Sequence, residues 1–415
     1  MVALLLAGGM GHRLNILVRD RAKPAVPFAG RYRIIDFTLN NIAHSDIQQV
    51  GILTQYLPES LTKYIGNGKA WGFNGHNRQI TILSSTNGSN PANQYYGTAD
   101  AVLKNLDYLK QFHTDDVIVL SGDHVYRMDY NQMFAFHRKK KADVTIAMKK
   151  VPWKDISNYG IATIDNEQRV IDWQEKPEQA RSNLASMGIY IFDLQFLEKA
   201  LSNRNGHDFG QNIIKDAYPE HRVYGHLFDG YWADVGTLPS YWKTNMDVIR
   251  PKSGLRLNDW RVRTNLDEER LFKHRPTVSI SKSAKVTNSF FSDGCVVEGT
   301  VIRSVLSPGV CIKKGARIIN SIIMHDSTVE SNSCLFDVVA DQQIHVRAGA
   351  QIGFGAGNKP NERYPDNVFT GLTIIGKNAI IPANLRIYRN TIIEPFVNEE
   401  SFEQQRLKVG SYIER

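Results

Sequence analysis

The chain has 415 residues, of which 42% are hydrophobic, 22% charged and 10% aromatic, a composition that excludes disorder as its main state. Its 50 lysines and arginines exceed its 42 aspartates and glutamates by a net charge of +8, which suits a small anionic ligand and does not call for nucleic acid. No stretch approaches the ~18 apolar residues of a membrane span, and the start MVALLLAGG lacks the features of a signal peptide. We therefore expect a cytoplasmic protein with neither nucleic acid nor membrane among its partners.

The chain contains three cysteines, Cys295, Cys311 and Cys334, and none belongs to a C-x-x-C pair. An odd number of cysteines gives no disulfide framework, and isolated cysteines commonly pack as small apolar side chains. We expect all three to be buried and to have no redox or metal role.

Apolar runs alternate with amphipathic patterns over the first 250 residues. The apolar runs predict buried strands, and the amphipathic patterns predict helices. The strands are expected at residues 2–6, 50–54, 117–120 and 144–148, and the helices at residues 34–43 and 98–112. This alternation indicates an α/β fold with a mostly parallel sheet, whose ligands bind beyond the carboxyl ends of the strands. We therefore expect functional residues directly after Leu6 and Leu120.

A glycine-rich loop follows the first predicted strand. Its glycines are Gly8, Gly9 and Gly11. Glycines let a backbone approach phosphates closely, and Arg13 and Lys23 add fixed positive charge shortly afterwards. The loop lacks the G-x-x-x-x-G-K-[ST] pattern, and Leu14 stands where a dinucleotide-binding fingerprint has its third glycine. By itself the loop fits either a phosphate-binding loop or a tight strand-to-helix turn.

The sequence changes to a six-residue repeat from about residue 278. The clearest run is Ile375, Ile381, Ile387 and Ile393, which are spaced six apart. A period of six fits neither an α-helix nor two-fold alternation, and it is typical of a parallel β-helix that places one aliphatic side chain inside on each face.

These patterns predict two domains joined by a linker. The first domain covers residues 1–250, the linker residues 251–277 and the β-helix residues 278–415. Residues 354–371 interrupt the repeat and are expected to form a polar excursion between coils.

Several short motifs accompany the glycine-rich loop, in which G-G-x-G-x-R-L is followed by K-P about ten residues later. They are RIIDF (33–37), TQY (54–56), YGTADA (96–101), SGDHVY (121–126), EKP (175–177), ASMGIY (185–190), HDFG (207–210) and YWADVGT (231–237). In this order they resemble the sugar-phosphate nucleotidyltransferases and, with the β-helical tail, the glucose-1-phosphate adenylyltransferase family, over essentially the whole chain.

This resemblance implies a fold and a reaction. The fold would be a Rossmann-like nucleotidyltransferase domain followed by a left-handed parallel β-helix. The reaction would transfer the adenylyl group of ATP to α-D-glucose 1-phosphate, giving ADP-glucose and pyrophosphate for glycogen biosynthesis. Two alternatives stay open, a non-catalytic regulatory subunit and a nucleotidyltransferase for another sugar 1-phosphate.

Two aspartates are the candidate metal ligands. Asp123 follows a predicted buried strand at its carboxyl end, and Asp234 lies in the YWADVGT motif. Nucleotidyl transfer needs a divalent cation on the triphosphate, and Mg²⁺ prefers carboxylate oxygens. A lone aspartate at a strand end more often caps a helix, but the family uses this pair for its Mg²⁺.

The resemblance also implies the residues that contact the substrates. Arg13 and Lys23, with the loop glycines, would bind the triphosphate and form the catalytic set together with Asp123. Lys176 would grip the sugar phosphate, although Glu175–Lys176 alone also fits a surface ion pair. The remaining substrate-binding residues would be Gln55, Tyr95, Gly97, Thr98, Gly160, Glu175 and Ser186. Gly97 and Thr98 would open a helix beside the adenine.

The chain departs from the family at a few positions. His12 replaces a threonine or serine in the loop, Asp20 stands where relatives have a lysine, and Pro27 stands where they have a histidine. The family's anionic allosteric effectors bind a basic cluster of which Arg21 and Arg33 remain here. Relatives are typically tetrameric, so we expect a homotetramer, or a heterotetramer with a related subunit.

Overall fold

The computed structural model describes the chain except for residues 76, 86–93, 203–205, 267–274 and 404–406. It consists of two compact units, one formed by Met1–Gly9 with Phe37–Trp232 and the other by Met10–Asp36 with Ala233–Arg415. The sequence pattern groups residues 1–250 together, whereas the contacts join residues 10–36 to the C-terminal part of the chain. The domain boundaries at residues 250 and 278 stay a prediction.

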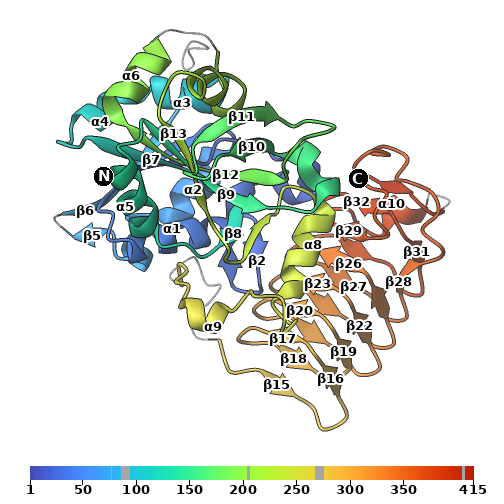
Figure 1. Cartoon of the computed structure of the whole chain (residues 1–415). Helices are drawn as coiled ribbons and strands as arrows, with labels where there is room; N and C mark the ends of the chain where they lie inside the picture. The colour runs from blue at the N-terminus through green and yellow to red at the C-terminus, as the bar shows by residue number, and fades with distance from the viewer. Residues whose placement is uncertain (76, 86–93, 203–205, 267–274, 404–406) are drawn as a thin grey trace. The chain divides into compact units, whose positions relative to one another are not determined.

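Among the described residues of the first unit, ten strands form one mixed sheet (Figure 1). They are β1 (Val2–Leu6), β4 (Gln49–Thr54), β5 (Asn74–Gly75), β6 (Arg78–Ser84), β7 (Asp116–Ser121), β9 (Val144–Lys150), β10 (Gly160–Ile164), β11 (Val170–Glu175), β12 (Leu184–Asp193) and β13 (Val223–Leu227). Their order is β11-β10-β12-β7-β1-β4-β6-β5, and β9 pairs with both β12 and β13. Strands β7, β1, β4 and β6 run parallel, so their carboxyl ends meet at one edge.

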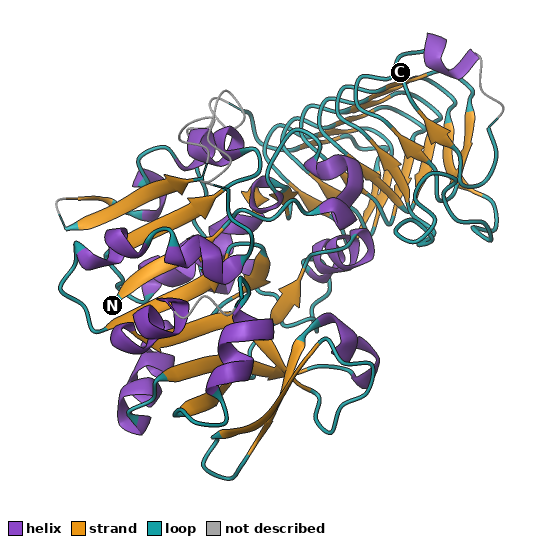
Figure 2. Cartoon of the chain, turned by 90° about the horizontal axis from the view of Figure 1, so that it is seen from above, coloured by secondary structure: helices purple, strands orange, loops and turns teal. Residues whose placement is uncertain are grey.

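The four strands expected from apolar runs are confirmed as β1, β4, β7 and β9. Residues 117–120 of β7 are fully buried because helices cover both faces of the sheet (Figure 2). Strands β10, β11 and β12 pair antiparallel and extend this core on one side.

Helices of the first unit connect and cover these strands. They are α1 (Ile34–His44), α2 (Pro58–Ile65), η3 (Lys69–Trp71), α3 (Thr98–Leu103), α4 (Leu106–Lys110), α5 (Tyr130–Lys140), η5 (Trp153–Asn158), α6 (Leu194–Ser202), η6 (Phe209–Ile214) and α7 (Lys215–Ala217). The helix expected at residues 34–43 is confirmed, but the one expected at 98–112 is two helices. Asn105 interrupts it, because its amide donates to Ala101 O at 2.8 Å and to the Tyr95 hydroxyl at 2.9 Å. Two short strands, β8 (His124–Tyr126) and β14 (Trp232–Asp234), complete the description.

The second unit contains a parallel β-helix with three faces (Figure 1). One face has β15 (Ser279–Ile280), β18 (Val296–Val297), β21 (Cys311–Ile312), β24 (Thr328–Val329), β27 (His345–Val346) and β30 (Ile380–Ile381). The next has β16 (Lys285–Thr287), β19 (Thr300–Ile302), β22 (Arg317–Ile319), β25 (Cys334–Phe336), β28 (Gln351–Phe354) and β31 (Arg386–Tyr388). The last has β17 (Phe290–Phe291), β20 (Val305–Leu306), β23 (Ile322–Ile323), β26 (Val338–Ala340), β29 (Thr373–Ile375), β32 (Ile392–Ile393) and β33 (Tyr412–Ile413).

The six-residue repeat has the expected structural meaning. The isoleucines at positions 375, 381, 387 and 393 lie on β29, β30, β31 and β32, and all are fully buried. Asparagines stand at the corners between these strands with positive φ, which asparagine tolerates better than most residues. Each face therefore contributes one aliphatic side chain to a continuous core.

The excursion at residues 354–371 is largely exposed, but two of its side chains are buried. Asn361 is fully buried, and its amide nitrogen donates to the carbonyls of Asn390, Gly410 and Ser411. Val368 is fully buried as well. Two inward-pointing side chains therefore fasten this loop to the β-helix.

The predicted linker contains α9 (Leu257–Trp260), whose end residues are buried, and its bounds stay a prediction. One further expectation needs correction. Among the cysteines, Cys295 is buried, but Cys311 and Cys334 are only partly buried. Each of the latter two precedes a fully buried residue, Ile312 or Leu335, and alternate side chains of a strand point to opposite faces.

The second unit also holds the segment that follows the glycine-rich loop. Its elements are η1 (His12–Val18), η2 (Lys23–Ala25), β2 (Pro27–Phe28) and β3 (Tyr32–Arg33), with α8 (Leu238–Asp247) and α10 (Glu400–Glu403) later in the chain. Helix α8 holds the segment through the Tyr241 hydroxyl, which donates to Pro27 O, and through Asn245 Oδ1, which accepts from Ala29 N at 2.9 Å. Along the described part of the chain, no helix is long and apolar enough to cross a membrane.

Candidate active site

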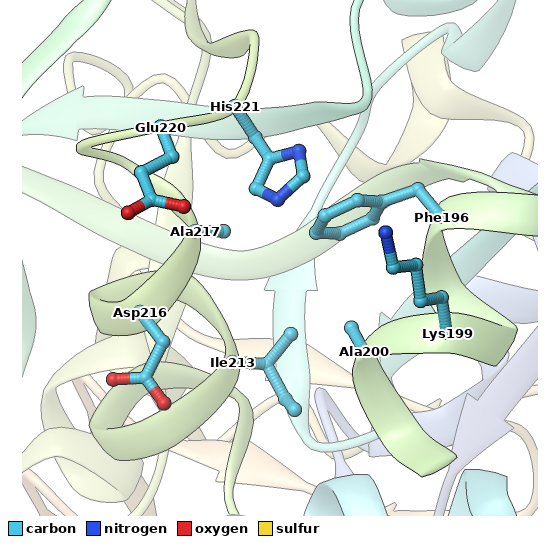
Figure 3. A pocket seen from close by; sticks show the side chains of 8 residues that line it. All are labelled: Phe196, Lys199, Ala200, Ile213, Asp216, Ala217, Glu220 and His221. Carbon is cyan, nitrogen blue, oxygen red and sulfur yellow. The ribbon is translucent and has the colours of Figure 1, made fainter. Parts of the chain in front are cut away.

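One cavity of the first unit lies away from every residue singled out in the sequence. It has a volume of about 190 Å³, and Figure 3 shows the side chains around it. His221 and Phe196 line it with their rings in edge contact at 4.8 Å between centroids. This cavity is therefore not the site expected from the motifs, whose residues are described next, beginning at the strands.

Three of the expected sugar-phosphate residues lie in a row across neighbouring strands. Gly160 of β10 is paired directly with Glu175 of β11, and Ile161 is paired with Ala185 of β12, next to Ser186. A Cβ atom at Gly160 would come within 2.4 Å of Cζ2 of the buried Trp173 ring and 2.7 Å of Glu175 Oε2, so the position requires glycine. The sheet register thus brings together Gly160, Glu175 and Ser186.

Glu175 and Lys176 form the charged end of this row. Burial raises the pKa of Glu175, and the neighbouring Asp208 carboxylate raises it further, while Lys176 opposes both. Lys176 Nζ lies 4.0 Å from Glu175 Oε1, and 58% of the lysine side chain is exposed. Glu175 and Lys176 therefore form an ion pair, which was the alternative expected from the sequence. The Lys176 ammonium is also accessible to a phosphate.

Ser186 is oriented by its own strand. Its hydroxyl donates to the Tyr190 hydroxyl at 3.2 Å and accepts from Gly188 N at 3.2 Å. Both Ser186 and Tyr190 are buried, so this geometry is fixed by packing.

Gln55 and Tyr95 are held together at the carboxyl ends of the parallel strands. Gln55 directly follows β4, and its amide donates to Tyr95 O at 3.2 Å and accepts from Tyr95 N at 2.7 Å. Gly8 follows β1, and a Cβ atom there would lie 3.3 Å from Gln55 Cβ. The expected residues Gly8, Gln55 and Tyr95 are therefore neighbours.

Gly97 and Thr98 open α3, as expected. A Cβ atom at Gly97 would overlap the carbonyl oxygen of His207, so only glycine fits there. The Thr98 hydroxyl donates to Asp208 Oδ2 at 3.1 Å and accepts from Phe209 N at 3.1 Å. Asp208 was not among the predicted site residues, although its HDFG motif contributed to the resemblance, and it links the start of α3 to Glu175.

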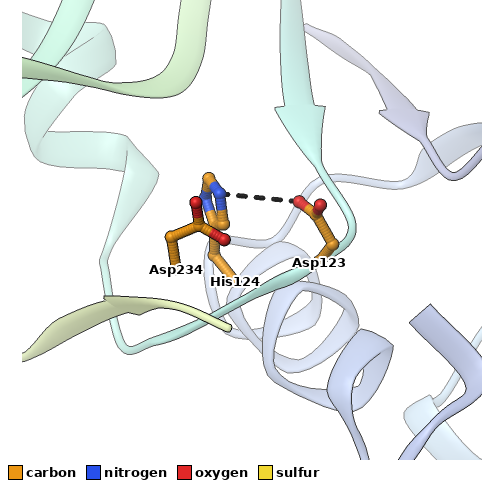
Figure 4. A group of neighbouring side chains, drawn as sticks. All are labelled: Asp123, His124 and Asp234. Atoms are coloured by element: carbon orange, nitrogen blue, oxygen red, sulfur yellow. Dashed lines mark ion pairs between the residues drawn. The ribbon is translucent and has the colours of Figure 1, made fainter. Parts of the chain in front are cut away.

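Asp123 lies two residues beyond the end of β7. Its Oδ1 accepts a hydrogen bond from the Ser121 hydroxyl and lies 3.5 Å from His124 Nε2 (Figure 4). The other ring nitrogen of His124 accepts from Trp232 Nε1 at 3.4 Å. His124 was missed in the sequence, where its position directly after Asp123 was the available signal.

Positive side chains of the second unit gather around Gly236. A Cβ atom at Gly236 would lie 2.9 Å from Asp234 Oδ1, 3.1 Å from Arg13 Nη2 and 3.3 Å from Lys23 Nζ. Lys23 is 6% exposed, and its Nζ lies 3.5 Å from Asp234 Oδ1. The structure therefore brings Arg13, Lys23 and Asp234 together. The backbone of Gly11 lies against the Lys23 side chain. Gly11 has a positive φ, a conformation that favours glycine.

The chemistry of the two aspartates fits a hard divalent cation. Their side chains are 28% exposed for Asp123 and 20% exposed for Asp234, so a cation and its remaining waters can reach the carboxylate oxygens. His124 offers a nitrogen next to Asp123.

The two expected effector residues have internal partners. Both amino groups of the Arg21 guanidinium bind the Asp341 carboxylate. Arg33 Nη1 donates to Ala25 O at 3.1 Å. An anionic effector at these residues stays a prediction.

Comparison with known proteins identifies the class. The family described as Nucleotidyl transferase matches residues 2–250, and the family described as GlmU-like, C-terminal hexapeptide matches residues 277–375. The first match agrees with the parallel strands of the first unit, and the second with a left-handed β-helix. The chain is therefore a nucleotidyl transferase by family, a class that generally uses divalent metal ions.

Individual relatives narrow the class. Proteins named glucose-1-phosphate adenylyltransferase are 44% identical in Thermomicrobium roseum and 40% identical in Acetivibrio thermocellus, each over 97% of this chain and 95% of the relative. One of the same name in Fervidobacterium nodosum is 39% identical over 95% of both chains. The chain belongs to the glucose-1-phosphate adenylyltransferase family.

Proposed function

We propose that the protein transfers the adenylyl group of ATP to α-D-glucose 1-phosphate, giving ADP-glucose and pyrophosphate for glycogen biosynthesis. The observation that carries the choice of substrates is the name shared by relatives that align with 97% of the chain. The residue geometry supports the reaction class, since Arg13, Lys23 and Asp234 lie together around Gly236, and Gly160, Glu175 and Ser186 lie in a row across β10, β11 and β12.

Arg13 and Lys23 bind the triphosphate in this proposal, together with Gly8, Gly9 and Gly11. Both cations face the same glycine, Gly236, and a guanidinium and an ammonium there would neutralise phosphate oxygens. Asp234 lies 3.5 Å from the Lys23 ammonium and aims it before ATP arrives.

Asp123 and Asp234 would hold Mg²⁺. When bound, the cation supplies positive charge to the α-phosphate and the leaving pyrophosphate. Ser121 orients the Asp123 carboxylate through its hydroxyl, and Trp232 fixes the ring of His124 beside it.

The acceptor binds along the row of β10, β11 and β12. Lys176 grips the phosphate of glucose 1-phosphate, and Glu175 accepts hydrogen bonds from sugar hydroxyls. Gly160, whose side-chain position is filled by Trp173 and Glu175, contributes backbone atoms, while Ser186 and Tyr95 complete the contacts. Gly97 and Thr98 present the start of α3 to the adenine.

The transfer is an in-line displacement at the α-phosphorus of ATP. A phosphate oxygen of glucose 1-phosphate forms the new P–O bond, and the bond to pyrophosphate breaks with its electron pair on the leaving oxygen. The nucleophile is already an anion at neutral pH, so no strong general base is needed. Catalysis is positioning and charge stabilisation by the residues above.

A pyrophosphate-release assay of the purified chain tests the proposal. ATP, UTP, GTP and dTTP are each combined with the 1-phosphates of glucose, glucosamine and mannose. The expected result is the highest kcat/KM for ATP with glucose 1-phosphate. A different preferred pair would assign another nucleotidyltransferase activity, and no turnover with any pair would favour a regulatory subunit.

We also propose that the protein is cytoplasmic and tetrameric, alone or with a related subunit. Its cysteines are free thiols, which suits a reducing compartment. Exposed apolar side chains on the first coil of the β-helix, Ile280 and Val286, support assembly through this domain.

A further inference from the structure

A buried ion pair joins the N-terminal segment of the second unit to the β-helix. Arg21 Nη1 and Nη2 lie 3.0 and 2.9 Å from Asp341 Oδ1 and Oδ2 respectively, which is a two-pronged arrangement. The Arg21 side chain is 9% exposed and the Asp341 side chain 1%. Asp341 directly follows β26, and its N–H is bonded to Ile375 O at 2.8 Å, so its backbone belongs to the rigid coil ladder.

A pair of this kind constrains geometry more than it adds stability. Removing two charges from water costs several kcal/mol per ion, and the attraction offsets this only when the partners are well oriented. A planar guanidinium that meets a carboxylate with two hydrogen bonds also fixes direction. The backbone at Arg21 is therefore held at one place on the β-helix.

Lys23 lies only two residues beyond this anchor. Ala22 between them is fully buried, and Pro24 after Lys23 has a fixed φ. The next anchor is Pro27, whose carbonyl accepts from the Tyr241 hydroxyl of α8. Lys23 thus lies on a short, stiff segment fastened at both ends, and its ammonium is placed beside Asp234 and Arg13 by these fastenings.

We propose that Asp341 is a positioning residue for the nucleotide site: through Arg21 it sets the place of Lys23, and thereby makes the β-helix a part of the machinery that binds the triphosphate. This inference rests on the proposed function. Asp341 lies in none of the sequence motifs of the site, and the proposal gives it a role in nucleotide binding.

The first test compares two aspartate-to-asparagine variants of the full-length protein. Asp341→Asn removes the buried charge, and Asp293→Asn removes the partner of Arg31, a pair of the same segment and the β-helix at 3.0 Å whose side chains are 33% and 53% exposed. We expect Asp341→Asn to raise the KM for ATP about tenfold and to change the KM for glucose 1-phosphate less than twofold. Asp293→Asn should leave both KM values within twofold.

A double variant separates positioning from folding. Arg21→Met with Asp341→Leu replaces the pair by apolar side chains of similar size, which is often neutral for stability. We expect the melting temperature of the double variant to be near that of the unaltered protein and above that of Asp341→Asn. Its KM for ATP should nevertheless stay high. Titration calorimetry with ATP alone should show the same weakening without any acceptor.

Each outcome decides between the alternatives. An unchanged KM for ATP in Asp341→Asn, or a KM that recovers together with the melting temperature in the double variant, would leave the pair a purely structural role. Failure of the proposed function is distinct, because the unaltered protein itself would then show no turnover with ATP and glucose 1-phosphate.

Discussion

Three charged side chains of the candidate site contact either an opposite charge or a hydrogen-bond donor. Lys23 faces Asp234, Lys176 faces Glu175, and Asp123 is held by Ser121. Such contacts keep each charge oriented in the absence of substrate, so less reorganisation is needed when phosphates arrive. The consequence is that single-atom changes at these residues should alter kinetics more than folding.

Asp123→Asn is expected to lower kcat by about 100-fold or more, because an amide cannot supply the anionic oxygen that a divalent cation requires. Its melting temperature should change by no more than a few degrees, since the amide has the same shape. Steady-state pyrophosphate release and thermal unfolding measure the two effects. Asp115→Asn, an exposed position just before β7 begins, is the matched control. Normal turnover of Asp123→Asn would remove the metal assignment.

Lys176→Ala is expected to raise the KM for glucose 1-phosphate about tenfold or more, since a charge-assisted hydrogen bond to phosphate contributes roughly 1.5–3 kcal/mol. The KM for ATP should stay nearly constant, because the triphosphate is assigned to Arg13 and Lys23. Lys154→Ala, on the exposed face of η5, serves as the control. Equal changes in both KM values would argue against a specific role for Lys176 at the sugar phosphate.

At the level of elements, the start of α3 depends on one close contact. Gly97 lies against the His207 carbonyl, and Thr98 and Asp208 bond beside it. Two segments more than a hundred residues apart in the chain are thus joined through a position without a side chain.

Gly97→Ala should therefore destabilise the protein by about 1–3 kcal/mol, the usual cost of forcing an extra methyl group into a packed contact. The KM for ATP should rise as well, because Thr98 moves with the backbone. Gly75→Ala, where a Cβ atom would meet no described atom within 4 Å apart from its chain neighbours, should leave the melting temperature unchanged within about one degree. Equal stability of the two variants would mean that the turn at His207 adapts.

Glu330 offers a test of the coil ladder by pH. A hydrogen bond from His345 is the main cause that lowers the pKa of Glu330, and the Ala348 N–H adds to it. A carboxyl whose pKa is lower in the folded state contributes stability above its unfolded pKa of about 4.5, and loses it as the pH falls through the folded value. Glu330→Gln should therefore lower the melting temperature at pH 7 by up to about two degrees, as for a partly exposed pair, and by less at pH 3, because the contribution is lost progressively below the unfolded pKa. A difference of the same size at both pH values would contradict this.

The sequence predicts elements with regular spacing well and contacts between distant residues poorly. The isoleucines six apart give the faces of the β-helix, and the apolar runs give β1, β4, β7 and β9, because local periodicity reports burial directly. The break at Asn105 was missed because the hydrogen bond from its side chain to Ala101 O leaves the amphipathic pattern of the sequence intact. The pairing of Arg21 with Asp341 could not be predicted, because the two residues lie 320 positions apart in the chain.

At the scale of the whole molecule, the exposed first coil of the β-helix predicts self-association. Ile280 is 51% exposed on β15, which pairs only with β18 among the described strands. We expect light scattering after gel filtration to give four times the chain mass of 46.9 kDa, and Ile280→Lys to reduce it. A monomeric unaltered protein would refute the assembly, and an unchanged mass for the variant would place the interface elsewhere.

The pairing of residues 10–36 with the C-terminal part of the chain has a consequence for biosynthesis. Arg21 leaves the ribosome 320 residues before Asp341 does, which at 5–20 residues per second is a delay of about 16–64 s. Throughout this interval Lys23 lacks its anchor, so an unfinished or prematurely terminated chain cannot complete its nucleotide site. Under the proposed role of Asp341, a chain must be translated beyond this residue before its nucleotide site is complete.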